Sequence, residues 1–122
     1  MNLTLTPSVL GGSVRVPTSK SEAHRSLIAA SLSALYNNEK SARVCFVECT
    51  DTNEDIDATA RCLNGLGAQI KRSDNGFFVT PITPDTLNSI QNNTLIDCGE
   101  SGSTLRFLLP IIPALGLRPA VP

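Results

Sequence analysis

The chain has 122 residues, of which 41% are apolar, and this is sufficient for the core of one ordinary domain. Ten Lys and Arg residues against eleven Asp and Glu residues leave a net charge of −1, which indicates neither a nucleic-acid partner nor a membrane surface. Aromatic residues make up 4%, with no Trp, which argues against base-stacking platforms. Because no apolar run could span a membrane and residues 1–16 lack signal-peptide features, we expect a cytoplasmic protein.

The cysteine pattern does not predict a metal site. The four cysteines include no C-x-x-C pair and have no neighbouring histidine, so the ligand spacing of zinc sites is missing; they are Cys45, Cys49, Cys62 and Cys98. Cys45 and Cys49 fall on one face of an apolar run, which predicts small, buried, reduced thiols.

The first elements are predicted from alternation and capping. Polar and apolar residues alternate over 2–16 around Gly11-Gly12, which predicts two short strands joined by a turn. The segment from Ser19 to Glu22 is typical of a capping box, and apolar residues follow at helical spacing. We therefore predict a helix over 20–36.

The middle of the chain predicts a strand, a helix and a hairpin. Residues 44–49 form an apolar run typical of a buried strand, and Thr52 with Asp55 repeats the capping signature before a second helix, which Gly65 and Gly67 end. Residues 69–72 and 77–80 flank an Asn-Gly step, which favours two paired strands.

The last third is predicted to be mixed. Residues 81–93 are mostly connection with at most one helical turn, 94–98 form a strand, and a glycine-rich turn over 99–104 leads into a third helix that Pro110 and Pro113 would shorten or kink. Residues 117–121 resemble a strand cut short, which suggests a truncated chain. The order of elements predicts an α/β fold with helices packed against sheet.

The opening turns of the first predicted helix concentrate polar groups: Lys20, Ser21, His24 and Arg25. Cations at a helix start oppose the dipole at a cost of about 0.3–1 kcal/mol each. A bound anion, either phosphate or carboxylate, would turn this repulsion into attraction. The alternative is that Lys20 and Arg25 are ordinary solvated charges and that the lone His24 is structural.

Residues 99–104 are a second candidate, because a glycine-rich turn between strand and helix can gather backbone amides around an anion. Ser103 stands where a P-loop has Lys, so nucleoside triphosphate binding is a poor fit, and an ordinary turn is the alternative. The positive charge of Arg106, one turn into the helix that follows, favours the anion-binding interpretation. A Ser-His-Asp hydrolase is disfavoured because no G-x-S-x-G segment is present.

Three segments in register resemble one family: residues 16–25 (VPTSKSEAHR), 51–55 (DTNED) and 99–106 (GESGSTLR). They are similar to the P-x-SKS-x-x-x-R, acidic and glycine-rich segments of 5-enolpyruvylshikimate-3-phosphate (EPSP) synthases. The resemblance implies transfer of the enolpyruvyl group of phosphoenolpyruvate to the 5-hydroxyl of shikimate 3-phosphate, with no metal or organic cofactor.

The resemblance also implies roles for individual residues. Lys20 would touch both substrates, Ser21 and Arg25 would contact shikimate 3-phosphate, and the backbone of Gly102 would approach phosphoenolpyruvate. Glu100 departs from the Asn often found at its position, and as a carboxylate it would repel phosphoenolpyruvate unless it were paired, for example with Arg106.

The family fold implied by the resemblance has two lobes, each built from three βαβαββ units. Residues 1–17 would be a strand pair that joins the other lobe, and residues 18–122 an incomplete first lobe. No catalytic acid–base group is expected in this segment, so we expect the isolated chain to be inactive. The alternatives are a relative of the UDP-N-acetylglucosamine enolpyruvyl transferases or a small non-enzymatic anion-binding α/β module. The sequence leaves the oligomeric state open.

Overall fold

A computed structural model describes residues 2–37, 42–90 and 94–117. The elements in these ranges, in chain order, are α1 (Lys20–Tyr36), β1 (Cys45–Glu48), α2 (Glu54–Gly65), β2 (Gln69–Ser73), β3 (Gly76–Thr80), α3 (Pro84–Ser89) and α4 (Gly102–Ala114). Helices pack against a sheet, which confirms the predicted α/β class.

The sheet is antiparallel, with strand order β1-β3-β2. The predicted hairpin at Asn75-Gly76 is confirmed, since β2 and β3 pair directly across it. Glycine is required there by a close approach, because a Cβ on Gly76 would lie 2.1 Å from the carbonyl oxygen of Val47 in β1. On the outer face of the sheet, Phe46 and Phe78 lie opposite each other with ring centroids 5.0 Å apart, and each is 48% exposed.

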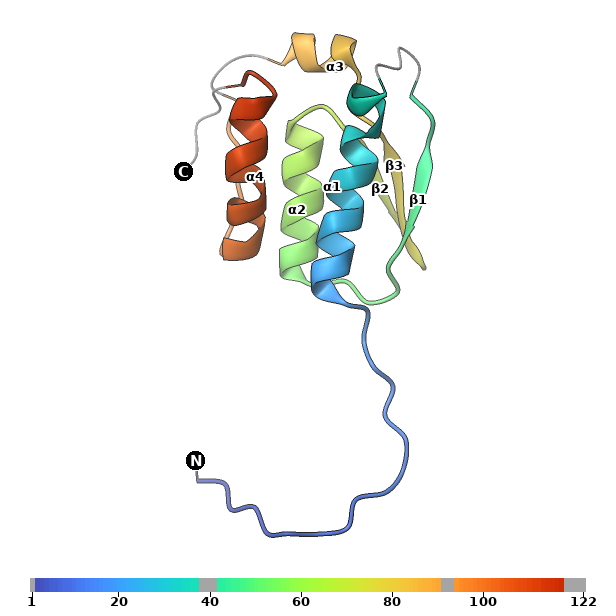
Figure 1. The fold of residues 1–122 in the computed structure, drawn as a ribbon, viewed down its shortest axis with the longest axis vertical. Helices are drawn as coiled ribbons and strands as arrows, with labels where there is room; N and C mark the ends of the chain where they lie inside the picture. Colours follow the sequence, from blue (N-terminus) through green and yellow to red (C-terminus); the bar gives the residue numbers. More distant parts are fainter. Residues whose placement is uncertain (1, 38–41, 91–93, 118–122) are drawn as a thin grey trace.

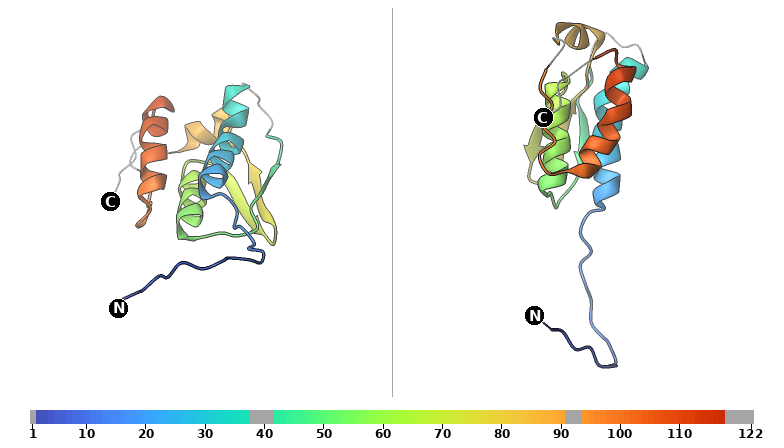
Figure 2. Two further views of the ribbon diagram at one scale, coloured as in Figure 1. Left: turned by 60° about the horizontal axis from the view of Figure 1, so that its bottom comes forward. Right: turned by 90° about the vertical axis from the view of Figure 1, so that its left-hand side faces the viewer.

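The helices form two further layers (Figures 1 and 2). Helices α1 and α2 contact each other and cover one face of the sheet, and α4 packs against α2 on the side away from the strands. Leucine, isoleucine and valine side chains from every layer meet in one core, including Leu27, Ile56, Leu63, Val79 and Leu108, which are at most 1% exposed. The region after β3 is tied to α1 by a hydrogen bond from the backbone N–H of Ile82 to the carbonyl of Ser31 at 2.8 Å.

The predicted bounds of one helix are confirmed, and the predictions for two others are corrected. Helix α1 has the predicted bounds, and Ser19 caps it as the sequence indicated. The second helix starts one residue later than the Thr52 signature suggested, because Asn53 is the capping residue. Helix α4 continues through Pro110 and Pro113 to Ala114; both prolines are exposed, so water can hydrate the carbonyl groups that lose a partner.

The strand pair predicted over 2–16 is not formed. Residues 2–17 are exposed and contain no strand. They form an extended arm that projects from the end of the molecule where α1 begins (Figure 1). Apolar side chains of the arm, such as Leu5 and Val9, are 94% and 101% exposed. A strand needs a neighbour for its backbone hydrogen bonds, and no described element pairs with the arm. The division of the chain between two lobes stays a prediction.

The strand predicted over 94–98 is also not formed; only Leu95 makes an isolated bridge. This segment packs on α2 instead of joining the sheet, because Arg61 Nε and the Cys62 thiol both donate to the carbonyl of Asp97, each at 3.3 Å. The strand predicted over 117–121 lies outside the described residues apart from Leu117.

Candidate anion-binding site

Three helices of the described part begin at one end of the molecule, the end from which the arm leaves (Figures 1 and 2). Each has a capping side chain that accepts a hydrogen bond from the backbone three residues later; these are Ser19 for α1, Asn53 for α2 and Ser101 for α4. Every helix start carries roughly half a positive charge and attracts anions. At α2 the chain itself supplies them, as three acidic side chains in the first turn, whereas the first turn of α4 contains no acidic residue and its start is left to attract an anion from outside.

Lys20 is the first residue of α1, and its ammonium group forms an ion pair with the carboxylate of Asp55 in the first turn of α2. The sequence predicted that a cation here would be repelled by the helix dipole unless an anion lay beside it. The Asp55 carboxylate is such an anion, supplied by the chain itself, so Lys20 is not a lone solvated charge. The Lys20 side chain is still 46% exposed, which leaves it accessible to a ligand.

Ser21 and Arg25 lie one helical turn apart on α1 and are both exposed. Within the described ranges, neither side chain has a hydrogen bond or an ion pair. Lys20 and His24, by contrast, turn toward α2, where both find partners. The first turns of α1 therefore divide into a face bonded to the protein and a face whose donors are free.

Gly102 is the first residue of α4 and is exposed. A Cβ added there would meet no atom within 4 Å, so the fold itself does not require glycine at this position. A cavity of about 240 Å³ opens beside it, lined by Asp97, Cys98, Gly99, Glu100, Ser101, Gly102 and Leu105. The close approach of a ligand to Gly102 stays a prediction.

Glu100 and Arg106 are both exposed and form no ion pair with each other. The suggestion that Arg106 neutralises Glu100 is therefore wrong for this structure. Gly99, directly before Glu100, has a left-handed φ of 55°, and its backbone N–H donates to Asp97 Oδ1 at 2.8 Å. This local turn fixes the loop without any contribution from the Glu100 side chain.

His24 is structural, as a lone helical histidine was expected to be. It is 1% exposed, and its Nδ1 lies 2.7 Å from the hydroxyl of Thr59 on α2. Burial, followed by the positive charge of Lys20, lowers the pKa of His24 from its ordinary value of 6.5. The Thr59 and Thr104 hydroxyls that continue this contact were not identified from the sequence, because isolated threonines 45 residues apart give no pattern.

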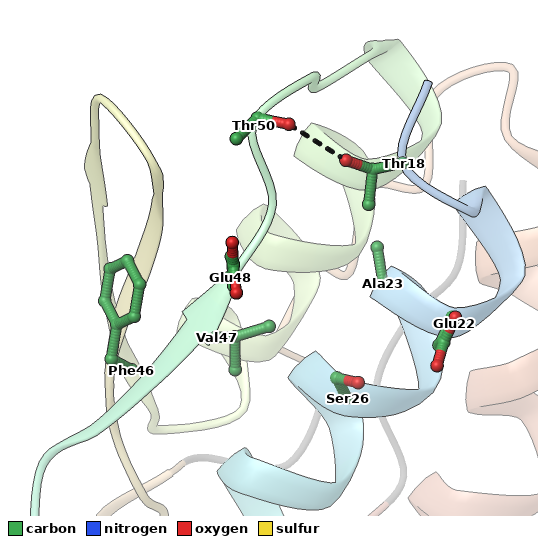
Figure 3. A pocket seen from close by; sticks show the side chains of 8 residues that line it. All are labelled: Thr18, Glu22, Ala23, Ser26, Phe46, Val47, Glu48 and Thr50. Carbon is green, nitrogen blue, oxygen red and sulfur yellow. Dashed lines mark hydrogen bonds between the residues drawn. The ribbon is translucent and has the colours of Figure 1, made fainter. Parts of the chain in front are cut away.

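A larger cavity of about 470 Å³ lies between the start of α1 and strand β1 (Figure 3). It is lined by Thr18, Glu22, Ala23, Ser26, Phe46, Val47, Glu48 and Thr50, and includes none of the four predicted site residues. The hydroxyls of Thr18 and Thr50 are hydrogen bonded across it at 3.2 Å (Figure 3). Its lining includes two carboxylates and no cation, and the smaller cavity beside Gly102 likewise includes two carboxylates and no cation. The lining side chains of neither cavity therefore attract an anion, and the case for Gly102 rests on its backbone N–H at the start of α4.

The four thiols are free. The predicted burial is confirmed for Cys49 but not for Cys45, which is only half-buried, and Cys62 and Cys98 are buried as well. Burial is the main cause that raises the pKa of Cys62 to about 12, and its sulfur lies 3.8 Å from that of Cys98. Within the described ranges, no three Cys, His, Asp or Glu side chains are grouped as a metal site would need, and no helix is long and apolar enough to cross a membrane.

Comparison with known proteins places these features in one family. The family model for EPSP synthase (3-phosphoshikimate 1-carboxyvinyltransferase) matches residues 5–119. Proteins named 3-phosphoshikimate 1-carboxyvinyltransferase are 41% identical in Clostridium beijerinckii over 113 residues and 45% identical in Clostridium perfringens strain SM101 over 107 residues. These matches cover 90% and 88% of this chain but 24% and 23% of the two relatives.

A third relative of the same name, from Clostridioides difficile, is 41% identical over 116 residues, which is 90% of this chain and 25% of the relative. The chain thus spans about a quarter of the length of the curated relatives it matches. The matched region contains all three helix starts and all four predicted site residues. The chain belongs to the EPSP synthase family.

Proposed function

We propose that this chain provides part of the substrate-binding surface of a 3-phosphoshikimate 1-carboxyvinyltransferase, which transfers the enolpyruvyl group of phosphoenolpyruvate to the 5-hydroxyl of shikimate 3-phosphate. The observation that carries the proposal is the convergence of three helix starts at one end, with free donors on α1 beside them. Both substrates are anions, and they can bind to the free donors of α1 and to the unpaired backbone N–H groups at the start of α4, where the first turn contains no acidic residue. The reaction belongs to the shikimate pathway and to aromatic amino acid biosynthesis.

The free donors of α1 are assigned to shikimate 3-phosphate. Ser21 and Arg25 are exposed on one side of the helix, where a phosphate or carboxylate could accept from both. Arginine can hold either group through two parallel N–H bonds, and a charge-assisted hydrogen bond contributes about 1.5–3 kcal/mol. Neither side chain has to leave another described partner to bind.

Lys20 and Gly102 are assigned to the region where the two substrates meet. Lys20 is held by Asp55 on one side and exposed on the other, so its ammonium can donate to a substrate without giving up its carboxylate partner. The backbone N–H of Gly102, at the start of α4, has no intrahelical acceptor and can point at phosphoenolpyruvate. The absence of a side chain permits a close approach.

The order of the elements supports a more detailed proposal for the fold. The order α1-β1-α2-β2-β3 corresponds to a βαβαββ unit without its first strand. β1 is an edge strand with one side unpaired in the described part of the chain, and the arm precedes α1 in sequence. We propose that the unit is completed by a strand from the segment before α1, and that the earlier residues of 1–17 join another lobe.

A titration followed by NMR tests the binding proposal. The ¹⁵N-labelled chain is titrated with shikimate 3-phosphate, and with UDP-N-acetylglucosamine as the competing class of substrate. We expect shikimate 3-phosphate alone to shift the amides of Lys20, Ser21 and Arg25. Arg25→Ala should weaken the affinity at least about tenfold, or 1.4 kcal/mol. Arg43→Ala is the matched control, since Arg43 is also exposed but lies beyond the far end of α1.

Two results would contradict the proposal. Shifts caused by UDP-N-acetylglucosamine at the same amides would point to the other class of transferase. Equal affinity in the Arg25→Ala and Arg43→Ala variants would show that Arg25 makes no contact with shikimate 3-phosphate.

A further inference from the structure

A continuous chain of buried hydrogen bonds crosses the three helix starts. His24 Nδ1 on α1 lies 2.7 Å from Thr59 Oγ1 on α2, which lies 2.8 Å from Thr104 Oγ1 on α4, and Thr104 Oγ1 lies 2.7 Å from Ser101 Oγ. All four side chains are at most 3% exposed. Most buried polar groups in proteins are hydrogen bonded, and here His24 Nδ1 and the three hydroxyls all find partners, so these hydrogen bonds link the three helices in one arrangement.

The direction of each bond follows from the number of protons available. The Thr104 hydroxyl donates its single proton to the carbonyl of Asp55 at 3.2 Å, because a carbonyl can only accept. Thr104 Oγ1 must therefore accept from Thr59 and from Ser101. Thr59, having donated its only proton, must accept from His24, so His24 carries its proton on Nδ1.

The other ring nitrogen agrees with this assignment. His24 Nε2 is buried and has no hydrogen-bond partner among the described residues. A bare lone pair there is less costly than a buried N–H without an acceptor. The imidazole is therefore neutral, with Nδ1 as its donor, and it packs beside the ring of Phe107 on α4 at a centroid distance of 5.7 Å.

The chain of hydrogen bonds is also connected to the Lys20–Asp55 ion pair. Lys20 and His24 are four residues apart on α1, and Asp55 and Thr59 are four residues apart on α2, so Lys20–Asp55 and His24–Thr59 form successive cross-links between the two helices. The Asp55 carbonyl accepts from Thr104 while its carboxylate holds Lys20. Asp55 thus connects the buried chain of hydrogen bonds to the partly exposed ammonium group of Lys20.

We propose that His24, Thr59 and Thr104 are positioning residues that hold Lys20 and the start of α4 at a fixed separation, with His24 acting as a neutral Nδ1–H donor. The identity of the anion that benefits rests on the proposed function, whereas the proton arrangement and the positioning do not. The three residues act through Asp55 and Ser101, and none of them is assigned a contact with substrate.

The first test is the tautomer of His24 in the unmodified chain. His24 is the only histidine in the sequence, so a long-range ¹H–¹⁵N spectrum of the imidazole contains one residue's signals. At neutral pH we expect the neutral form protonated on Nδ1. A neutral ring protonated on Nε2, or equal amounts of the two tautomers as in a free imidazole, would overturn the proposal.

The second test compares Thr104→Val, which keeps the shape and removes the hydroxyl, with Thr104→Ser, which keeps the hydroxyl. In Thr104→Val we expect the amides of Lys20, Ser21 and Gly102 to shift while those of β2 and β3 do not, and shikimate 3-phosphate affinity to fall about fivefold. Thr104→Ser should restore the wild-type amide positions.

The outcomes of the second test separate this inference from the proposed function. Unchanged helix-start amides in Thr104→Val, or changes spread equally over β2 and β3, would overturn the inference. If the unmodified chain does not bind shikimate 3-phosphate, the proposed function fails, and the tautomer and the amide shifts still decide whether the chain of hydrogen bonds positions the helix starts.

Discussion

The two glycines that flank the turn before α4 should respond oppositely to replacement by alanine. Gly102 lies in the first turn of α4, its φ is not positive, and a Cβ there would touch nothing within 4 Å. Gly99 has a φ of 55°, and a Cβ there would lie 3.3 Å from Arg61 Nη2. The end of the arginine side chain can move away, so backbone strain decides the outcome at Gly99.

The expected changes in the free energy of unfolding follow from the surroundings of the two glycines. Alanine is favoured over glycine by about 0.8–1.0 kcal/mol in a helix interior, and the first helical residue should realise roughly half of this, so Gly102→Ala is expected to stabilise the chain by about 0.5 kcal/mol. An alanine in the left-handed region costs about 1–2 kcal/mol, so Gly99→Ala is expected to destabilise the chain by about that amount.

Urea unfolding of both variants, followed by circular dichroism, measures these differences. If Gly102→Ala lost stability by as much as Gly99→Ala, the fold itself would require glycine at 102, and the reasoning from the empty surroundings would be refuted. If Gly102→Ala gains stability but weakens phosphoenolpyruvate binding in an active enzyme that contains this chain, then glycine at 102 serves the ligand and not the fold.

Three further predictions concern activity, pH and thiols. The purified 122-residue chain should release no phosphate from phosphoenolpyruvate plus shikimate 3-phosphate above a no-enzyme control, because its assigned residues only bind; measurable release would contradict this. The unfolding free energy should fall as the pH drops below 6.5, the ordinary pKa of histidine. The pKa of His24 is lowered in the folded chain, so the unfolded state binds the proton more readily and is favoured as the pH falls. The His24→Asn variant should show a smaller decrease over the same pH range. Iodoacetamide at pH 8 should label the half-buried Cys45 before Cys62, whose pKa of about 12 and burial keep it protonated; mass spectrometry that finds Cys62 labelled first would refute this.

The helices and strands that are determined by neighbouring residues were the ones predicted correctly from the sequence. Helix α1 has its predicted bounds because its capping side chain and its apolar spacing lie within the same 17 residues and their immediate neighbour. The hairpin follows from one Asn-Gly step. The capping residue of α2 was missed by one position because Asn53 is also a good cap and stands next to Thr52.

The wrong predictions concern segments whose structure depends on distant partners. Alternation over 2–16 shows which residues could line one face of a strand, but a strand forms only where a neighbour accepts its hydrogen bonds. The segment 94–98 had strand-like composition, yet its Asp97 carbonyl is occupied by donors of α2. Likewise, the pairing of Lys20 with Asp55 joins residues 35 positions apart, and only the packing of α1 on α2 brings them together.

The residues proposed to bind substrate were easier to identify from the sequence than the residues proposed to support them, and the reason is physical. Ser21, Arg25 and Gly102 are exposed, and neither Ser21 nor Arg25 has a described side-chain partner. In the sequence, Arg25 is recognisable as a positive charge near a helix start, Ser21 as a hydroxyl one turn before it, and Gly102 as a glycine at a helix start. Supporting residues such as Thr59 and Thr104 are fully buried among apolar neighbours and resemble ordinary core positions in sequence. Their hydroxyls are nevertheless the groups that link the three helices, so the geometry of the proposed binding surface depends on polar atoms buried in the core.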